Sequence, residues 1–97
     1  MVIWSEPAKE DLKQIHSHIA QDSDYYAQKV IATLIEQSEM LDSFPQMGRM
    51  VPEIMVNDIR ELILYSYRMI YEITGKDVII HSVIHAKRDF DKAFDIP

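Results

Sequence analysis

Three side chains in the second half of the chain carry chemistry suited to a phosphodiester: Arg68, His85 and Arg88. A guanidinium binds phosphate oxygens through two parallel hydrogen bonds, and an imidazole gains and loses a proton near neutral pH. An imidazole beside two guanidiniums can therefore move a proton next to a bound phosphate, as cleavage of RNA through its own 2′-hydroxyl requires. One interpretation of these three residues is a ribonuclease site.

A second interpretation makes Arg68 a partner in ion pairs. Glu72 follows Arg68 by four residues, and Glu61 lies on the neighbouring predicted strand. Both carboxylates fall on the same predicted sheet face as Arg68, because side chains two or four residues apart on a strand share a face. There they neutralise the arginine and repel an incoming phosphate. We favour the ion-pair interpretation, and phosphate binding stays as the alternative.

Two further arginines give weaker signals. Arg49 follows Gly48 in a predicted loop, where it is available to bind a partner. Arg60 falls on a predicted buried face, so it needs an acid or a carbonyl as its partner, or a place at the rim of the core. We expect a structural role for Arg60.

The spacing of the histidines argues against a metal site. His81 and His85 share a predicted strand face, but four residues along a strand separate them by about 13 Å. Two ligands that each lie about 2 Å from one ion cannot be that far apart. His16 and His18 are two positions apart on a predicted helix and point in different directions. We expect no metal, and a chain of this size leaves no room for a large cofactor pocket.

The arginines and histidines must be positioned by the elements of the fold. The first of these are a short N-terminal strand and two helices that follow it. Residues 2–4 are apolar and long enough for a strand, and Ser5 offers an N-cap for the next helix. That helix carries an apolar stripe at helical spacing, formed by Ala8, Leu12, Ile15 and Ile19. Residues 22–24 cap a second helix, which ends at residues 44–45, and residues 45–57 form a loop. The two helices are expected to form an antiparallel hairpin.

Beyond residue 57 the apolar pattern changes from a helical period to alternation. Three runs rich in β-branched and aromatic residues predict strands at 59–64, 67–73 and 78–84, joined by turns at 65–66 and 74–77. Pairing through these turns places one nearly apolar face against the helices. The other face mixes apolar and ionic residues: Ile59, Glu61, Ile63, Arg68, Ile70, Glu72, Ile79, His81, Val83 and His85. We expect this face to be partly open, which suggests a surface for a partner or substrate.

Length and composition are those of one folded domain over residues 1–97, and the order of the expected elements makes it an α+β domain. We expect a small antiparallel sheet with an N-terminal helix hairpin packed on one face, in the order β-α-α-β-β-β, and a short helix or a tail at residues 89–94. The net charge of −6 argues against nonspecific attraction to nucleic acid. The chain has no cysteine, which excludes disulfides and thiol catalysis. No apolar run approaches the roughly 20 residues that span a bilayer, so we expect a cytoplasmic protein with no membrane partner.

An ordered set of short motifs resembles the RelE/ParE toxin superfamily. No single motif is specific, but together they span nearly the whole chain in the right order. They are Trp4-Ser5, Ala8-x-x-Asp11-Leu12-x-x-Ile15, Phe44-Pro45-x-x-Gly48-Arg49, Ile59-Arg60-Glu61-Leu62, Tyr67-Arg68-Met69-Ile70-Tyr71 and Val83-Ile84-His85-Ala86-x-Arg88-Asp89. The resemblance implies the toxin of a type II toxin–antitoxin pair, with a small antitoxin whose C-terminal segment folds on binding.

Two branches of that superfamily imply different activities. In the RelE-like branch, ribosome-dependent mRNA endonucleases use basic residues on the open sheet face, and Arg68 and Arg88 match two of these positions. Two lysine positions of that branch correspond here to Ile59 and Glu61, and its tyrosine position to Phe94. The ParE-like branch, whose members typically poison DNA gyrase without a catalytic site of their own, resembles this sequence better.

The sequence therefore predicts a ParE-like toxin that binds DNA gyrase and is neutralised by a cognate antitoxin. A RelE-like endoribonuclease with Arg68, His85 and Arg88 at its site, or a family member that is not toxic, are the alternatives. We expect the antitoxin to cover the helix hairpin or the open sheet face and to be able to add a strand at an edge. The residues expected to bind the target or the antitoxin are Arg49, Glu61, Arg68, His81, His85, Arg88 and Phe94.

Overall fold

The computed structural model describes residues 1–86, along which two helices and five strands follow one another. They are β1 (Val2–Trp4), α1 (Glu6–Ala20), α2 (Asp24–Met40), β2 (Arg49–Met50), β3 (Ile59–Leu64), β4 (Tyr67–Thr74) and β5 (Asp77–His85). The predicted bounds of the first strand and of the strand at 59–64 are confirmed. The turn predicted at 74–77 is shorter than expected, because Thr74 pairs with Asp77 and leaves only two residues between the strands. The helix or tail predicted at 89–94 lies outside the described residues.

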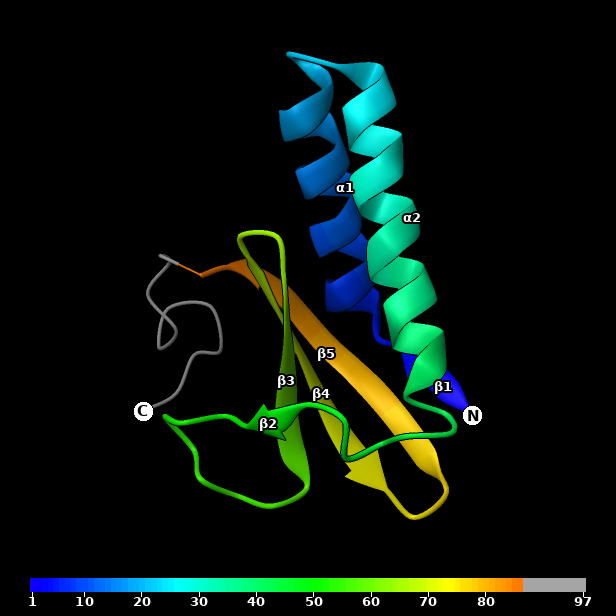
Figure 1. The fold of residues 1–97 in the computed structure, drawn as a ribbon, viewed down its shortest axis with the longest axis vertical. Helices are drawn as coiled ribbons and strands as arrows, with labels where there is room; N and C mark the ends of the chain where they lie inside the picture. The colour runs from blue at the N-terminus through cyan, green and yellow to red at the C-terminus, as the bar shows by residue number, and fades with distance from the viewer. Residues whose placement is uncertain (87–97) are drawn as a thin grey trace.

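The two helices begin at the predicted caps. The hydroxyl of Ser5 accepts a hydrogen bond from the Ala8 amide at 3.2 Å, and the hydroxyl of Ser23 accepts one from the Tyr26 amide at 3.1 Å. Figure 1 shows the helices side by side as the predicted antiparallel hairpin, which extends past the end of the strands. Within residues 1–86, no helix is long and apolar enough to cross a lipid bilayer.

The strands form one mixed sheet in the order β1-β5-β4-β3-β2. β1 pairs in parallel with β5, whereas the other neighbouring strands are antiparallel, so the prediction of an antiparallel sheet is correct for the C-terminal strands only. β2 lies in the segment predicted as a loop, where Arg49 pairs with Glu61 and Met50 with Arg60. A pairing of two residues leaves no alternating pattern that a sequence could show.

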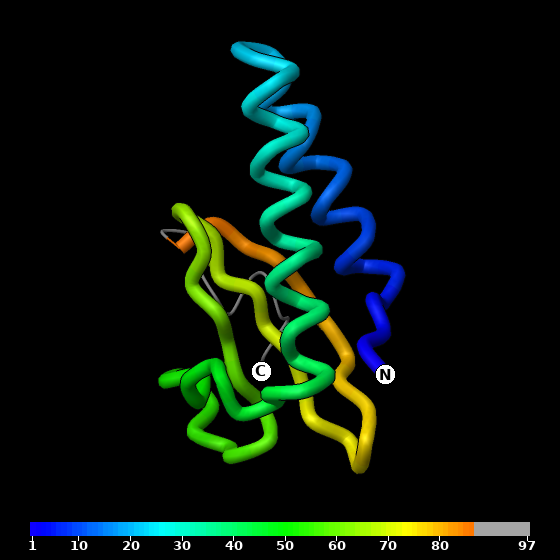
Figure 2. Tube along the Cα trace, turned by 45° about the vertical axis from the view of Figure 1, so that its right-hand side comes forward, coloured from blue at the N-terminus to red at the C-terminus, as the bar shows by residue number. Residues whose placement is uncertain are grey.

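One face of the sheet carries the helices and the main core. In Figure 2, α1 lies to the right of α2, the lower half of α2 overlaps the strands, and the green segment between α2 and β3 lies at the lower left. Ten buried side chains form the main core between the helices and the sheet: Ala8, Ile15, Val30, Leu34, Leu41, Met69, Tyr71, Val78, Ile80 and Val83. A second, smaller cluster of Val51, Ile70 and Ile84 packs with Ile54 and Ile59, so the β2–β3 segment covers part of the face predicted to be open.

A β-bulge in β5 changes which face its last residues occupy. Tyr71 pairs with Ile80, as the sequence predicts, but the preceding residue Ile70 pairs with Ser82. His81 is therefore an extra residue in β5, and one extra residue reverses the alternation of side chains beyond it.

The faces predicted for residues 83–85 are wrong for this reason. Val83 packs in the main core beneath the helices, and His85 lies beside Tyr67 on that same side. Ile84 packs instead with Ile70 in the smaller cluster on the opposite face. The bulge thus moves the only imidazole of the predicted ribonuclease trio to the helix side of the sheet.

Candidate functional site

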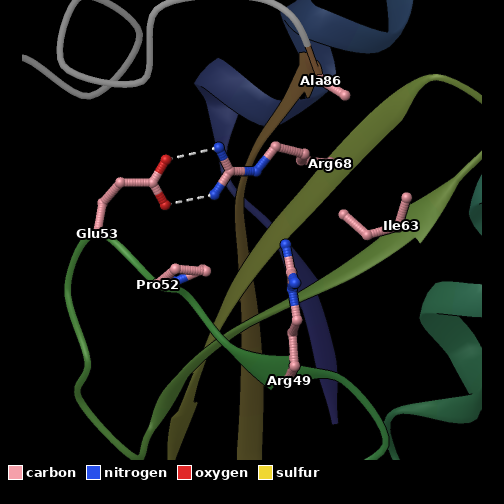
Figure 3. Close-up of a pocket in the computed structure, with 6 residues that line it drawn as sticks. All are labelled: Arg49, Pro52, Glu53, Ile63, Arg68 and Ala86. Atoms are coloured by element: carbon pink, nitrogen blue, oxygen red, sulfur yellow. Dashed lines mark hydrogen bonds and ion pairs between the residues drawn. The ribbon is translucent and has the colours of Figure 1, made fainter.

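Two arginines and two glutamates form a connected ion cluster on the sheet face away from the helices. One carboxylate oxygen of Glu61 accepts a hydrogen bond from Nε of Arg68 at 2.7 Å, and the other accepts one from Nε of Arg49 at 2.7 Å. Arg68 also donates from both terminal nitrogens to the carboxylate of Glu53, at 2.7 and 2.8 Å (Figure 3). The four charges alternate in the order Arg49, Glu61, Arg68, Glu53, and they sum to zero.

Three strands and one loop bring these four groups together. Arg49 on β2 lies directly opposite Glu61 on β3, and Arg68 on β4 pairs with Ile63, two residues further along β3. Arg68 is thus diagonal to Glu61 on the same face, within reach of a long side chain. Glu53 comes from the segment after β2, which the packing of Val51 in the smaller apolar cluster holds against the sheet.

The loop before β2 is tied to the sheet by Tyr71. Its hydroxyl donates to the carbonyl of Pro45 at 2.7 Å and accepts from the amide of Gly48 at 2.9 Å. A Cβ on Gly48 would lie 2.5 Å from the Glu61 carbonyl oxygen and 2.7 Å from the Tyr71 hydroxyl, so only glycine fits here. This close approach explains why a glycine precedes Arg49. It also places Arg49 beside Glu61 in the cluster.

Hydrogen bonds within this cluster shift the pKa values of Glu53 and Arg68 toward their charged forms, against the effect of burial. The side chain of Glu61 is 0% exposed, and that of Arg68 is 9% exposed. Hydrogen bonds from Arg68 lower the pKa of Glu53, against the opposing effect of its partial burial, and the nearby charge of Arg49 lowers it further. The bonds to Glu53, and then those to Glu61, raise the pKa of the Arg68 guanidinium. Because a buried ion is costly without a partner, the cluster depends on all of its members.

The ion-pair interpretation of Arg68 is confirmed, with one partner correct and one wrong. Glu61 pairs with Arg68 as predicted, but Glu72 accepts instead from Nε2 of His81, with the two atoms 2.8 Å apart. The second partner of Arg68 is Glu53. Glu53 lies fifteen residues before Arg68 in a loop. The only signal for this pair in the sequence is that a buried arginine needs a second acceptor.

The other two predicted arginine environments also have an outcome. Arg49 is not unpaired as its predicted loop position suggested, since it holds Glu61. Arg60 finds the carbonyl partner that the sequence predicts: its terminal nitrogen donates to the Gly48 carbonyl at 2.8 Å, and Nε donates to the Asn57 carbonyl at 2.9 Å.

A groove of about 440 Å³ opens beside the ion cluster. Its walls are Arg49, Pro52, Glu53, Ile63, Arg68 and Ala86, which Figure 3 shows as sticks. The groove holds two guanidiniums, three of its lining residues are apolar, and none of its described lining residues is a histidine. As arranged, it can bind ions and apolar groups, but these residues include no imidazole that could gain and lose a proton near neutral pH.

His85 lies in a different groove, of about 260 Å³, between α1 and the sheet. There its ring meets the ring of Tyr67 edge to face, with centroids 5.7 Å apart, and Asp11 and His18 of α1 line the same groove. The structure therefore does not bring Arg68 and His85 together. Arg88 and Phe94 lie outside the described residues. In residues 1–86, no group of three histidine, aspartate or glutamate side chains is placed to hold a metal ion.

Comparison with protein-family models identifies the family of this chain. The family model of the ParE toxin of the type II toxin–antitoxin system, parDE, matches residues 2–90. A solved structure of the chromosomal ParDE toxin–antitoxin system from P. aeruginosa has a similar fold, with a TM-score of 0.72 and 23% identity over 87% of this chain and 92% of that chain. A search of curated proteins finds no match. Since the family model covers nearly all of the chain, this chain belongs to the ParE toxin family of type II toxin–antitoxin systems.

Proposed function

We propose that this ParE-type toxin inhibits growth in the cytoplasm by binding DNA gyrase, with no catalytic group of its own, and that a cognate antitoxin neutralises it. The observation that carries the proposal is the state of Arg68. This arginine matches a phosphate-binding position of the nuclease branch, but Glu53 and Glu61 hold it in hydrogen bonds of 2.7–2.8 Å. An RNA phosphate would have to displace a bidentate carboxylate to reach it.

The position of His85 supports the same proposal. A general acid or base must lie within hydrogen-bond reach of the proton that it transfers. His85 lies on the helix side of the sheet, whereas Arg68 lies on the opposite face. These two groups therefore cannot act on one phosphodiester in the arrangement described.

The overall charge also favours a protein target. At −6, the chain is repelled over long range by the polyanionic RNA of a ribosome. Binding to a protein surface needs only local complementarity of charge and shape. An acidic protein can offer this through one groove that is lined by arginines.

The surfaces left for the antitoxin are the helix hairpin and an edge of the sheet. β2 pairs with only the first half of β3, at Arg60 and Glu61. The backbone of β3 from Leu62 to Leu64 has no strand on its outer side in the described part of the chain. A partner strand can pair there, which is a common way for a sheet to bind an extended segment.

The decisive experiment compares gyrase with ribosomes as targets. We would induce the chain in cells, with and without the gene beside it, and then test the purified toxin on gyrase supercoiling and on translating ribosomes. We expect growth arrest and gyrase inhibition in the wild type, and no codon-positioned cuts in mRNA with either the wild type or the His85→Ala variant. Arrest should disappear when the neighbouring gene is co-expressed.

Two results would overturn this proposal. Codon-positioned cuts in mRNA that vanish in His85→Ala would identify a nuclease instead. No growth effect at all, from a chain shown to be folded, would identify a family member that is not toxic.

A further inference from the structure

The two arginines of the ion cluster use the same edge of their guanidinium groups to hold Glu61. Arg68 donates from Nε to one oxygen of Glu61 at 2.7 Å, and one of its terminal nitrogens lies 2.6 Å from the same oxygen. Arg49 donates from Nε to the other oxygen at 2.7 Å, and one of its terminal nitrogens also lies 2.7 Å from that oxygen. Glu61 is thus held in the same way from both sides. On each arginine, the outer edge between the two terminal nitrogens shares one nitrogen with this contact, and the other terminal nitrogen has no contact with Glu61.

The outer edges of the two arginines differ in what they hold. On Arg68 this edge carries the carboxylate of Glu53 in a bidentate pair. On Arg49, Nη1 has no acceptor within residues 1–86, Nη2 contacts only Glu61 there, and the side chain is 62% exposed. The chain itself therefore shows which group fits such an edge, and the described residues leave the equivalent place on Arg49 open.

The walls beside Arg49 are apolar on one side. Ile63 is 49% exposed although it lies in the middle of a strand, and it lines the same groove as Arg49 and Pro52. In Figure 3, the guanidinium of Arg49 points into the space between Ile63 and the Arg68–Glu53 pair. A ligand for this place needs an anionic group for the arginine and an aliphatic group for the wall.

We propose that this groove binds an acidic side chain of a partner protein, with the carboxylate on the outer edge of Arg49 and an aliphatic neighbour against Ile63. The inference deepens the proposed function, on which the choice of a protein as partner rests. It assigns the groove a ligand of defined chemistry, a glutamate or aspartate flanked by aliphatic residues.

A carboxylate fits this groove better than a nucleic-acid phosphate does. The cluster sums to zero charge before the ligand arrives, so one further negative charge is tolerated, but a run of phosphates would meet Glu53 as well. A peptide carboxylate also comes with aliphatic neighbours, which gain from contact with Ile63 and Pro52. The sugar–phosphate backbone of a nucleic acid carries no aliphatic side chain that could make these contacts.

The wild-type chain alone can test the inference with three probes. These are the blocked peptide acetyl-Leu-Glu-Leu-amide, its acetyl-Leu-Gln-Leu-amide counterpart, and inorganic phosphate. NMR titration would follow the Nε–H of Arg49 and the methyl groups of Ile63. A charge-assisted bidentate pair should make the glutamate peptide bind roughly tenfold or more tightly than the glutamine peptide, with shifts at both residues.

A variant of Arg49 separates shape from charge. Arg49→Lys keeps a positive charge near Glu61 but cannot form a bidentate pair, so we expect it to weaken binding of the glutamate peptide about tenfold. Lys76→Ala, which removes an exposed cation in the β4–β5 turn, is the matched control and should bind as the wild type does. If Arg49→Lys does not fold, the comparison of the two peptides on the wild type still decides.

The outcomes separate this inference from the proposed function. Equal binding of the two peptides, or phosphate that shifts Arg49 at lower concentration than the glutamate peptide, would overturn the groove assignment even if gyrase is inhibited. Selective binding of the glutamate peptide at Arg49 supports the groove even in a chain that leaves gyrase unaffected, in which case only the proposed target fails.

Discussion

Glu61 is the residue on which the ion cluster depends most directly. It is fully buried, and both of its oxygens are occupied by arginines that come from different strands. A glutamine at this position would keep the shape, but its amide nitrogen would face a guanidinium donor. The cluster would then hold two positive charges against one negative charge.

We therefore expect Glu61→Gln to lower the free energy of unfolding by about 3–5 kcal/mol, the range for breaking a buried ion pair on one side. Urea unfolding at neutral pH would measure the change. Glu72→Gln is the matched control, because its partner His81 is a third exposed and such a pair is worth about 1 kcal/mol or less. A similar loss in both variants would show that burial of Glu61 carries no special weight.

Glu53 gives the cluster a dependence on pH. Its pKa lies below the ordinary 4.5 because Arg68 donates to its carboxylate. The unfolded chain, which lacks this bond, takes up the proton at a higher pH than the folded chain does. The stability that Glu53 contributes is therefore complete above its ordinary pKa, and it is lost as the pH falls through the lowered value.

We expect the wild type to be more stable than Glu53→Gln at neutral pH, and the difference to shrink as the pH falls below 4.5. Urea unfolding of both proteins, from neutral to strongly acid pH, would show two curves that converge. Curves that stay parallel throughout would mean that Glu53 contributes through packing and not through its charge.

At the scale of the elements, local patterns predicted both helices and four of the five strands in residues 1–86, whereas long-range contacts determine β2 and the bulge in β5. The alternation from Ile59 to Leu64 sets the bounds of β3 because it records one buried face along a single strand. The bulge at His81 leaves no such record. Its stability comes from Asp11, seventy-one residues before Ser82, whose carboxylate accepts from the Ser82 hydroxyl and the Val83 amide, each at 2.9 Å.

The same reason explains what the sequence could and could not predict about the site. The pairing of Arg68 with Glu61 follows from the register of two neighbouring strands, which the short turn at residues 65–66 fixes. Glu53 reaches Arg68 only because its loop folds back over the sheet, and His85 leaves the open face only because of the bulge. No spacing in the sequence encodes either event.

Asp11 should therefore control the local stability of the bulge. Asp11→Leu removes the acceptor of two polar groups and should cost about 1–3 kcal/mol, whereas Asp11→Asn keeps an oxygen and should cost about 1 kcal/mol or less. Hydrogen exchange at the Val83 amide should quicken in the order wild type, Asn, Leu. Glu10→Leu, at an exposed position of the same helix, is the control. Unchanged exchange at Val83 in Asp11→Leu would contradict this role.

At the scale of the whole molecule, the sheet separates two surfaces and the helix hairpin extends past it (Figure 1). The ion cluster opens on one face, and the groove of His85 opens on the other, under α1. A partner that covers one of these grooves leaves the other exposed, which suits a toxin that must meet both a target and an antitoxin. The position of the extended hairpin relative to the sheet then determines the shape of the helix-side groove.

The β3–β4 turn supports this hairpin through Tyr65. Its ring meets that of Tyr26 edge to face, with centroids 6.3 Å apart, and its hydroxyl donates to Oγ1 of Thr33 at 3.3 Å. Tyr65 has a φ of 56°, a left-handed conformation that costs a tyrosine roughly 1–2 kcal/mol. The contacts of Tyr65 with α2 therefore offset part of the free-energy cost of its left-handed backbone conformation.

Replacing Tyr65 should separate these two effects. Tyr65→Asn relieves the backbone, because asparagine tolerates this conformation, and it removes a ring pair worth about 0.5–1.5 kcal/mol. We expect the global free energy of unfolding to change little, while amide exchange in the first turns of α2 becomes roughly two- to tenfold faster. Tyr26→Ala should quicken the same amides but also lower global stability, since it leaves the strained turn in place. Tyr25→Ala, next to it and 67% exposed, should do neither.

If exchange in α2 is unchanged by both Tyr65→Asn and Tyr26→Ala, the hairpin is held by its contacts with the main core alone, and the turn plays no part in shaping the helix-side groove.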